Sequence, residues 1–354
     1  MLSLIQEQIV KSSAKKIVVI ASAASGKSTV VVERIRYLIE NGFNPRSIVS
    51  LSFTNNAANN VRDRLDNPPG LICNTVHGYA NMLLSRAGIS TKKTIEREDF
   101  DGLFQLVKQH PECIQPVDYL TLDEAQDSTH EQFEFIFDYV KPKQWMIVGD
   151  PRQTIYGFNG SDSSLLINLT YNEDVVTYEL NENFRNGKTI LNYAKEIIRG
   201  AGSDYIDSSI SMSGREGKLS FIEYDLDLIP QIIKKAHKEY GQNYGDWFIL
   251  NRTNQQLEET SKKIKTIGIP YDTFRQAQLT NAQIDKKMKE DTVKILTIHS
   301  SKGLERKNVI VIGAHKYNFE ETCVSYVAAT RAEDWLIWTS SKPKAPRRQR
   351  WRNY

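Results

Sequence analysis

The stretch Ile17-Val18-Val19-Ile20-Ala21-Ser22-Ala23-Ala24-Ser25-Gly26-Lys27-Ser28-Thr29 decides the fold of this chain. Its apolar start predicts a short buried strand, and apolar spacing over Ser28–Asn41 predicts a helix. Between them lies a candidate phosphate loop, in which backbone N–H groups at a helix N-terminus cradle phosphates. Lys27 would reach the β- and γ-phosphates, and the Ser28 hydroxyl would bind Mg²⁺. The alternative is a chance Gly-Lys-Ser sequence at a helix start.

Similar apolar runs recur along the rest of the chain and alternate with helical patterns. The further predicted strands are Ile48–Phe53, Tyr119–Leu122, Trp145–Val148, Val293–Ile298, Val309–Ile312 and Trp335–Thr339. The further predicted helices are Asn55–Leu65, Glu131–Tyr139 and Gln255–Ile267. Near-continuous apolar strands between helices indicate buried parallel sheets in an α/β protein. Because the strands fall before about residue 178 and after about residue 217, we expect two α/β lobes with a ligand cleft between them.

The composition is that of an ordinary globular chain. Of 354 residues, 40% are hydrophobic and 25% are charged, which excludes a disordered chain. No apolar run approaches the roughly 18 residues of a membrane helix, and the N-terminus lacks the pattern of a signal peptide. Cys73, Cys113 and Cys323 are isolated in the sequence and form no metal-binding spacing. We therefore expect a cytoplasmic protein without a membrane partner.

Positive charge is concentrated at the C-terminal end. The tail at 342–354 contains six basic residues and no acid: Lys342, Lys344, Arg347, Arg348, Arg350 and Arg352. Removing these six charges from the net charge of +3 leaves the rest of the chain at −3. Such a tail can bind a polyanion, with Trp351 stacking on a base. The alternative is a disordered, solubilising end.

A pair of carboxylates follows the predicted strand Tyr119–Leu122. A carboxylate at the end of a strand beside a phosphate loop can hold Mg²⁺, and a second can orient and deprotonate an attacking water. We assign Asp123 to the metal and Glu124 to the water. The alternative is a solvated acidic turn that caps a helix starting near Ser128.

Together with these two sites, an ordered set of segments resembles the UvrD/Rep/PcrA type of superfamily 1 DNA helicases. The resemblance spans residues 2 to about 339. In chain order its segments are Leu2–Gln6, the phosphate loop, Ser52–Ala58, Asn74–Tyr79, Asp123–Asp127, Gly149–Phe158, Leu180–Arg185, Phe248–Leu257, Thr297–Glu305 and Tyr326–Ala332.

The resemblance implies an α/β fold of two RecA-like lobes with parallel sheets flanked by helices and an ATP cleft between them. The first lobe would span 1–178, with a small helical insertion at about 80–117. The second would span 179–341 and would be followed by the basic tail. The implied substrate is ATP. The implied metal is Mg²⁺, which Ser28 and Asp123 would hold.

Further roles come from the resemblance alone. Gln6 would hydrogen-bond adenine, Phe184 would stack on it and Glu305 would meet the ribose. Gln153 would sense the γ-phosphate, and Arg185 and Arg331 would act as arginine fingers. The alternative for Arg185 is a surface salt bridge, and the alternative for Arg331 is a charge at a helix start. The loop residues expected to contact nucleotide are Ala23, Ala24, Ser25, Gly26, Lys27, Ser28 and Thr29.

Single-stranded DNA would cross both lobes. Phe53, Tyr156 and Phe158 match base-stacking aromatics, whose alternative is core packing. The matching polar contacts are Thr54, Asn55, His77, Arg252, Asn254 and His299.

The chain departs from the family at several points. Ser22 and Ala24 stand where the family has glycine, and a left-handed loop position favours glycine at Ala24. Phe158 stands where the family usually has Trp, and Asn159 where it has Arg. The first insertion is reduced and the second, between the strand near Pro270–Phe274 and the segment Thr297–Glu305, is almost absent. We therefore expect a minimal motor.

Three functions compete. The first is ATP-driven 3′→5′ translocation on single-stranded DNA with some unwinding of tailed duplexes. The second is a DNA-dependent ATPase or translocase that unwinds poorly alone and serves an accessory protein. The third is an ATP-switched nucleic-acid-binding module, against which the retention of Glu124, Gln153, Arg185 and Arg331 argues. RNA remains an alternative substrate.

Overall fold

The fold was determined as a computed structural model that describes residues 2–199, 207–273, 279–313 and 319–339. Contacts within the chain divide it into two compact units, and the division lies between Glu182 and Asn183. The strand at Val176–Leu180 pairs with the first sheet, so the first unit runs a few residues past the expected boundary at 178. The basic tail and Trp351 lie outside the described residues.

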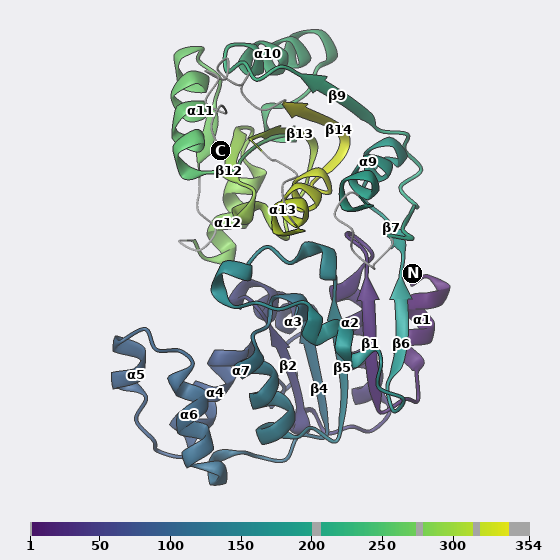
Figure 1. Cartoon of the computed structure of the whole chain (residues 1–354), viewed down its shortest axis with the longest axis vertical. Helices are drawn as coiled ribbons and strands as arrows, with labels where there is room; N and C mark the ends of the chain where they lie inside the picture. Colours follow the sequence, from purple (N-terminus) through teal and green to yellow (C-terminus); the bar gives the residue numbers. More distant parts are fainter. Residues whose placement is uncertain (1, 200–206, 274–278, 314–318, 340–354) are drawn as a thin grey trace, which may run out of the picture. The chain divides into compact units, whose positions relative to one another are not determined.

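The first unit is built on a parallel sheet (Figure 1). From edge to edge its strands are β3 (Ile72–Thr75), β2 (Ile48–Ser52), β4 (Tyr119–Asp123), β5 (Gln144–Gly149), β1 (Lys16–Ala21) and β6 (Val176–Leu180). Ile17 and Ile20 of β1 lie opposite Met146 and Gly149 of β5. This register sets the ends of β1, β4 and β5 beside one another.

Helices flank this sheet. They are α1 (Leu4–Lys11), α2 (Lys27–Glu40), α3 (Asn55–Arg64), α4 (Val76–Arg86), α5 (Lys92–Glu96), α6 (Gly102–Gln109), α7 (His130–Glu134) and α8 (Ser164–Leu169). The predicted helix over 131–139 is present as α7 continued by a π-helical segment, Phe135–Val140. The insertion at 80–117 is helical, and Figure 1 shows α5 and α6 on the side of the unit away from β1 and β6.

The second unit repeats the architecture. Its parallel sheet has the order β11 (Tyr271–Thr273), β12 (Val293–Thr297), β10 (Trp247–Asn251), β13 (Arg306–Ile312), β14 (Ala332–Thr339) and β9 (Lys218–Ile222). Its helices are α9 (Lys188–Arg199), α10 (Leu228–Tyr240), α11 (Asn254–Thr266), α12 (Asn281–Lys289) and α13 (Phe319–Ala329). A separate two-stranded sheet pairs β7 (Glu182–Asn183) with β8 (Ile210–Ser211).

The predicted parallel sheets are confirmed, and every predicted strand is present. In the two large sheets, the strands absent from the prediction are β3, β6, β9 and β10; the short β7 and β8 were not predicted either. Three of the first four lie at sheet edges, where a strand is covered less completely. In β6, for example, only Leu180 is buried, so the strand does not read as a continuous apolar run.

Each unit has its own apolar core. In the first, buried residues of β1 and α2 pack together, among them Ile17, Val19, Val31 and Ile35. In the second, Trp247, Ile249, Ile295 and Ile310 form the equivalent layer. Among the described residues, no helix combines the length and apolar character needed to cross a membrane.

Lys294 is a fully buried lysine of the second unit. The Lys294 side chain, on β12, has no exposed surface and lies 3.0 Å from Oδ2 of Asp272 on β11. Its ammonium also donates to the carbonyl of Glu290 at 3.1 Å. Burial opposes ionisation of Asp272, but the hydrogen bond from Thr292 and the ion pair with Lys294 outweigh it and hold the pKa of Asp272 below its usual value.

The change Asp272→Asn should lower the free energy of unfolding by about 3–5 kcal/mol at neutral pH, because it leaves the Lys294 ammonium buried without its counter-charge. Chemical denaturation measures this loss. The pKa of Asp272 is lowered by folding, so its contribution is present above an unfolded-state pKa of about 4 and is lost as the pH falls through the folded-state value.

The wild-type advantage over Asp272→Asn should therefore shrink in acid. The control is Asp285→Asn, at an exposed position on α12, which should change stability by less than about 0.5 kcal/mol. Equal stability of wild type and Asp272→Asn at neutral pH would contradict the assignment.

Candidate nucleotide and nucleic-acid sites

The phosphate loop joins β1 to α2, as predicted. Its backbone is left-handed at Ala24, with φ of 56°, and at Gly26, with φ of 83°. Ala24 thus occupies the kind of position that favours glycine. One side-chain hydrogen bond holds the loop from within, and one backbone hydrogen bond ties it to β6. Ser25 Oγ donates to the Ser22 carbonyl at 2.8 Å, and the Ser22 N–H donates to the Leu180 carbonyl at 2.7 Å.

Gln6 lies directly against this loop. Ser3 caps α1 and exchanges hydrogen bonds with Gln6, so the glutamine has a fixed position in the first turn. Its Nε2 donates to the Ser25 carbonyl at 2.9 Å, and the residue is 5% exposed. A Cβ at Gly26 would lie 2.6 Å from this Nε2 and would displace the glutamine amide, while the positive φ of Gly26 itself favours glycine. The structure brings Gln6 to the loop; its contact with adenine stays a prediction.

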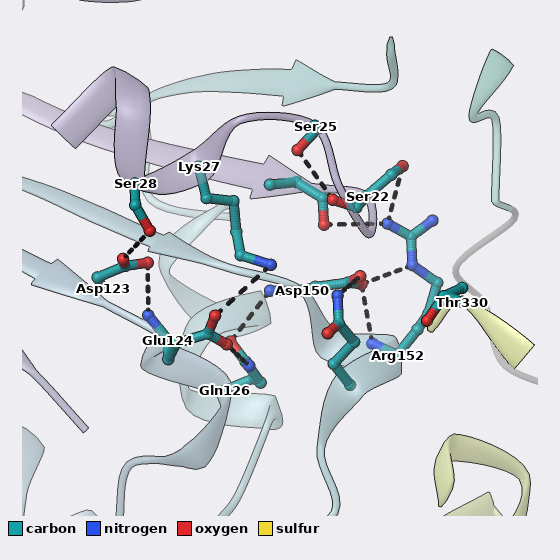
Figure 2. A network of polar contacts seen from close by, with 12 residues as sticks. Ser22, Ser25, Lys27, Ser28, Asp123, Glu124, Gln126, Asp150, Arg152 and Thr330 are labelled. Atoms are coloured by element: carbon teal, nitrogen blue, oxygen red, sulfur yellow. Dashed lines mark hydrogen bonds and ion pairs between the residues drawn. The ribbon is translucent and has the colours of Figure 1, made fainter. Parts of the chain in front are cut away.

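The acidic pair lies opposite the start of α2 (Figure 2). Asp123 ends β4, and its Oδ2 accepts a hydrogen bond from Ser28 Oγ at 2.9 Å. Glu124 has a left-handed φ of 58°, uncommon outside glycine, and its Oε1 lies 3.8 Å from Lys27 Nζ. Burial, reinforced by the charge of Glu124, raises the pKa of Asp123 to about 6. Four predicted site residues from two distant segments therefore meet.

These residues fit a nucleotide-bound Mg²⁺. A buried carboxylate that is hard to ionise beside a hydroxyl is stabilised by a cation, and Mg²⁺ typically takes one or two protein ligands, waters and phosphate oxygens. Within the described residues, no group of three or more His, Cys, Asp or Glu side chains could hold a metal. The hydroxyl of Ser28 and the carboxylate of Asp123 suit a metal that binds together with phosphates.

Three further polar residues join this site that sequence reasoning did not assign. They are Gln126, Asp150 and Arg152, all almost completely buried. Both segments that contain them had been recognised. The available signal was that Tyr119–Leu122 and Trp145–Val148 were both predicted as strands of a parallel sheet, whose carboxyl ends lie at one edge; their adjacency is seen only in the structure.

Gln153 lies in the same turn and is 4% exposed, with its Nε2 donating to Asp150 Oδ2 at 2.7 Å.

Phe53, Tyr156 and Phe158 form an aromatic trio on the first unit. Phe53 follows β2, and the other two follow the turn after β5. Phe53 and Tyr156 stack at 5.1 Å between ring centroids, and Phe158 lies 6.1 Å from Tyr156. Phe158 is 66% exposed, and the other two are half-buried. The three aromatics predicted to bind DNA therefore lie together, and core packing does not account for Phe158.

The polar residues expected beside DNA in this unit have local partners. Thr54 caps α3 by accepting from the Ala57 N–H, and exposed Asn55 begins that helix. His77, near the start of α4, stacks on Phe104 of the insertion at 5.0 Å and lies 3.4 Å from Asp101.

In the second unit, Arg185 and Glu305 form an ion pair. Arg185 Nη2 lies 2.6 Å from Glu305 Oε2, and its Nη1 donates to the Thr330 carbonyl at 3.2 Å. Arg331 is 2% exposed and donates to the carbonyls of Val327 and Leu304. The helix-start charge does not describe Arg331, whose guanidinium is buried beyond the end of α13.

Models of known families match both units. A model of the UvrD/REP helicase N-terminal domain matches residues 2–116 and 103–173. A model of the UvrD-like helicase C-terminal domain matches residues 272–343. The chain belongs to the UvrD-like helicase family. The two matched regions contain the loop and acidic pair in one unit, and Glu305 and Arg331 in the other.

Curated relatives of this UvrD-like chain carry helicase names. It is 23% identical over 363 residues to a probable DNA helicase II homolog of Mycoplasma capricolum, covering 73% of this chain and 49% of the relative. It is 25% identical over 376 residues to the ATP-dependent DNA helicase PcrA of Staphylococcus epidermidis, covering 75% and 50%. The PcrA of Staphylococcus aureus is also 25% identical, with the same coverage. The chain spans about half the length of these relatives.

The remaining predicted site residues of the second unit differ in exposure and in their partners. Exposed Phe184 has 45% of its surface accessible. Arg252 pairs with Glu321 of α13 at 2.5 Å, which gives this guanidinium a structural partner in addition to any role on DNA. Exposed Asn254 begins α11, and His299 lies in the turn after β12.

Proposed function

We propose that this chain is an ATP-dependent DNA motor that moves 3′→5′ on single-stranded DNA and unwinds tailed duplexes. The observation that supports this best is the meeting of Lys27, Ser28, Asp123 and Glu124 at the ends of β1 and β4. A phosphate loop beside a metal-binding carboxylate and a second, water-orienting carboxylate is the arrangement that phosphoryl transfer needs.

The proposed chemistry depends on positioning and charge. Mg²⁺ held by Ser28 and Asp123 would neutralise phosphate charge. Lys27 would bind the β- and γ-phosphates, and Glu124 would orient and deprotonate the attacking water. We propose that Gln153 senses the γ-phosphate and that Arg185 and Arg331 stabilise the charge of the transferred group. Gln6, Phe184 and Glu305 would bind the adenosine.

The segment that contains Gln153 also leads to the aromatic trio, which supports single-stranded DNA as the partner. Stacking on aromatic side chains is tolerant of base identity, as a translocating motor requires. Polarity, the preference for DNA over RNA, an accessory protein and a cytoplasmic location stay predictions.

A second candidate is a translocase that unwinds poorly alone. Only residues 274–292 lie between β11 and β12, and α12 is the helix in their described part, 279–292. The insertion in the first unit is limited to short helices. Within the described residues, little structure is thus available to split a duplex.

The test is to measure ATP turnover with and without single-stranded DNA, and then to offer duplexes with a 3′ or a 5′ tail. We expect stimulation by DNA and unwinding from the 3′ tail. Absence of stimulation would exclude the motor, stimulation without unwinding would favour the translocase, and unwinding only from a 5′ tail would contradict the polarity.

The change Tyr156→Ala should weaken single-stranded DNA binding about 5–150-fold, since one stacked base is worth about 1–3 kcal/mol. Fluorescence anisotropy of a labelled oligonucleotide measures it. Tyr171→Ala is the matched control, because Tyr171 is 77% exposed and lies outside the trio. Unchanged affinity of Tyr156→Ala would show that Phe53 and Tyr156 only pack on one another.

A further inference from the structure

A buried polar network surrounds Asp150, the residue that follows β5 (Figure 2). The Asp150 side chain has no exposed surface. Its Oδ1 accepts from the backbone N–H of Arg152 at 3.1 Å and from the Arg152 Nε at 2.7 Å, while Oδ2 accepts from Gln153 Nε2 at 2.7 Å. We call Asp150, Arg152, Gln153, Gln126 and Ser22 the Asp150 network.

One arm of the network reaches Glu124. Gln126 is completely buried, and its Nε2 donates to Glu124 Oε2 at 2.5 Å. Its Oε1 accepts from the Asp150 N–H at 3.0 Å. The amide thus ties the carboxylate to the backbone that follows β5. A Cβ at Gly149 would lie 2.7 Å from Gln126 Oε1, so the absence of a side chain at 149 makes room for this bridge.

The other arm reaches the phosphate loop. Arg152 Nη2 donates to the Ala21 carbonyl at 3.2 Å and to Ser22 Oγ at 3.2 Å. A buried guanidinium has several donors that each need an acceptor, and Ser22 supplies one that glycine could not. Ser22 is also fixed through its own N–H and carbonyl by Leu180 and Ser25. The serine at this position therefore has a specific partner in Arg152.

We propose that the Asp150 network is a two-armed positioning device. Gln126 sets the orientation of Glu124 toward the attacking water, and Arg152 with Ser22 holds the phosphate loop in its nucleotide-binding shape before nucleotide arrives. This inference rests on the proposed ATP hydrolysis. Because a carboxylate that is free to rotate spends less time aimed at the water, the first arm acts on turnover. Because a preformed loop loses less entropy on binding, the second acts on affinity.

A merely structural network would behave differently. Loss of any member would then reduce the folded fraction, and turnover and nucleotide binding would fall together. The two arms instead predict a split between kcat and affinity while the calorimetric stoichiometry stays that of wild type, which misfolding does not produce. Single substitutions that keep the side-chain volume close to the original can separate an effect on kcat from an effect on nucleotide affinity.

The change Gln126→Met keeps the side-chain length and removes both hydrogen bonds. We expect kcat for ATP to fall about 10–100-fold, as for loss of a positioning group, with the Kd for Mg²⁺-ADP within about 2-fold of wild type. Ser22→Ala should act mainly on affinity, raising the Kd for Mg²⁺-ADP about 2–10-fold through loss of one hydrogen bond, with a smaller effect on kcat than Gln126→Met has. Steady-state ATP turnover measures kcat, and titration calorimetry with Mg²⁺-ADP measures the Kd.

Matched controls are Gln105→Met and Ser85→Ala, at exposed positions on α6 and α4, which should behave as wild type. Proportional loss of kcat and Mg²⁺-ADP binding in both network variants, or wild-type values for both, would overturn the proposal. If wild type itself hydrolyses no ATP, the proposed function fails, while the Mg²⁺-ADP titration of Ser22→Ala still decides whether the second arm exists.

Discussion

The change Glu124→Gln is expected to lower DNA-stimulated ATP turnover about 10²–10⁴-fold, the usual contribution of a general base. Glutamine has the shape of glutamate, so the bond from Gln126 can persist, but its amide cannot take a proton from water. The ion pair with Lys27, at 3.8 Å, is a minor loss. Substrate binding should remain, because the phosphate loop and Asp123 are unchanged.

Steady-state turnover and oligonucleotide binding in the presence of ATP together test this expectation. The matched control is Glu131→Gln, the same chemical change at an exposed position of α7, which should leave turnover unaffected. Turnover that persists in Glu124→Gln would remove Glu124 from the mechanism. If the wild type shows nucleotide-dependent DNA binding with no turnover to lose, the ATP-switched binding module becomes the better description.

The sequence predicted local structure well where one segment carries the whole signal. The strand, loop and helix over residues 17–41 needed no tertiary information, because apolar spacing and the Gly-Lys-Ser sequence are local. The meeting of Ser28 with Asp123 was also predictable, since both residues follow buried parallel strands.

Contacts that depend on register between distant strands were not predictable in the same way. Arg152 bonds to Ser22 because β5 lies beside β1, with Gly149 opposite Ile20, and strand order is not written in either segment. The ion pair between Arg185 and Glu305 likewise joins residues from two distant motifs. Each motif could be recognised by itself, whereas the network that joins them required the fold.

The second unit offers a test of a different kind, because Arg185 has two competing explanations. As an arginine finger, its loss should lower kcat about 10³–10⁵-fold. As a salt bridge to the 44%-exposed side chain of Glu305, it would contribute about 0–1 kcal/mol to stability and little to turnover. The predicted effects differ by orders of magnitude, so Arg185→Ala separates them, and we expect the large loss.

Two further variants show whether the loss of kcat in Arg185→Ala comes from the guanidinium itself or from the broken ion pair. Arg185→Lys keeps the charge but lacks the planar fork of donors, so it should recover only part of kcat. Glu305→Gln removes the ion-pair partner and leaves the guanidinium in place. It should raise the KM for ATP, if Glu305 meets the ribose, and change kcat by less than about 10-fold, because a weak pair is lost while the finger remains.

If Glu305→Gln and Arg185→Ala lower kcat equally, the ion pair is the functional unit and Arg185 is no finger. If Arg185→Ala retains wild-type kcat, the charge on the transferred phosphoryl group is stabilised elsewhere, and Arg331, whose guanidinium is already bound to the Val327 and Leu304 carbonyls, becomes the residue to test.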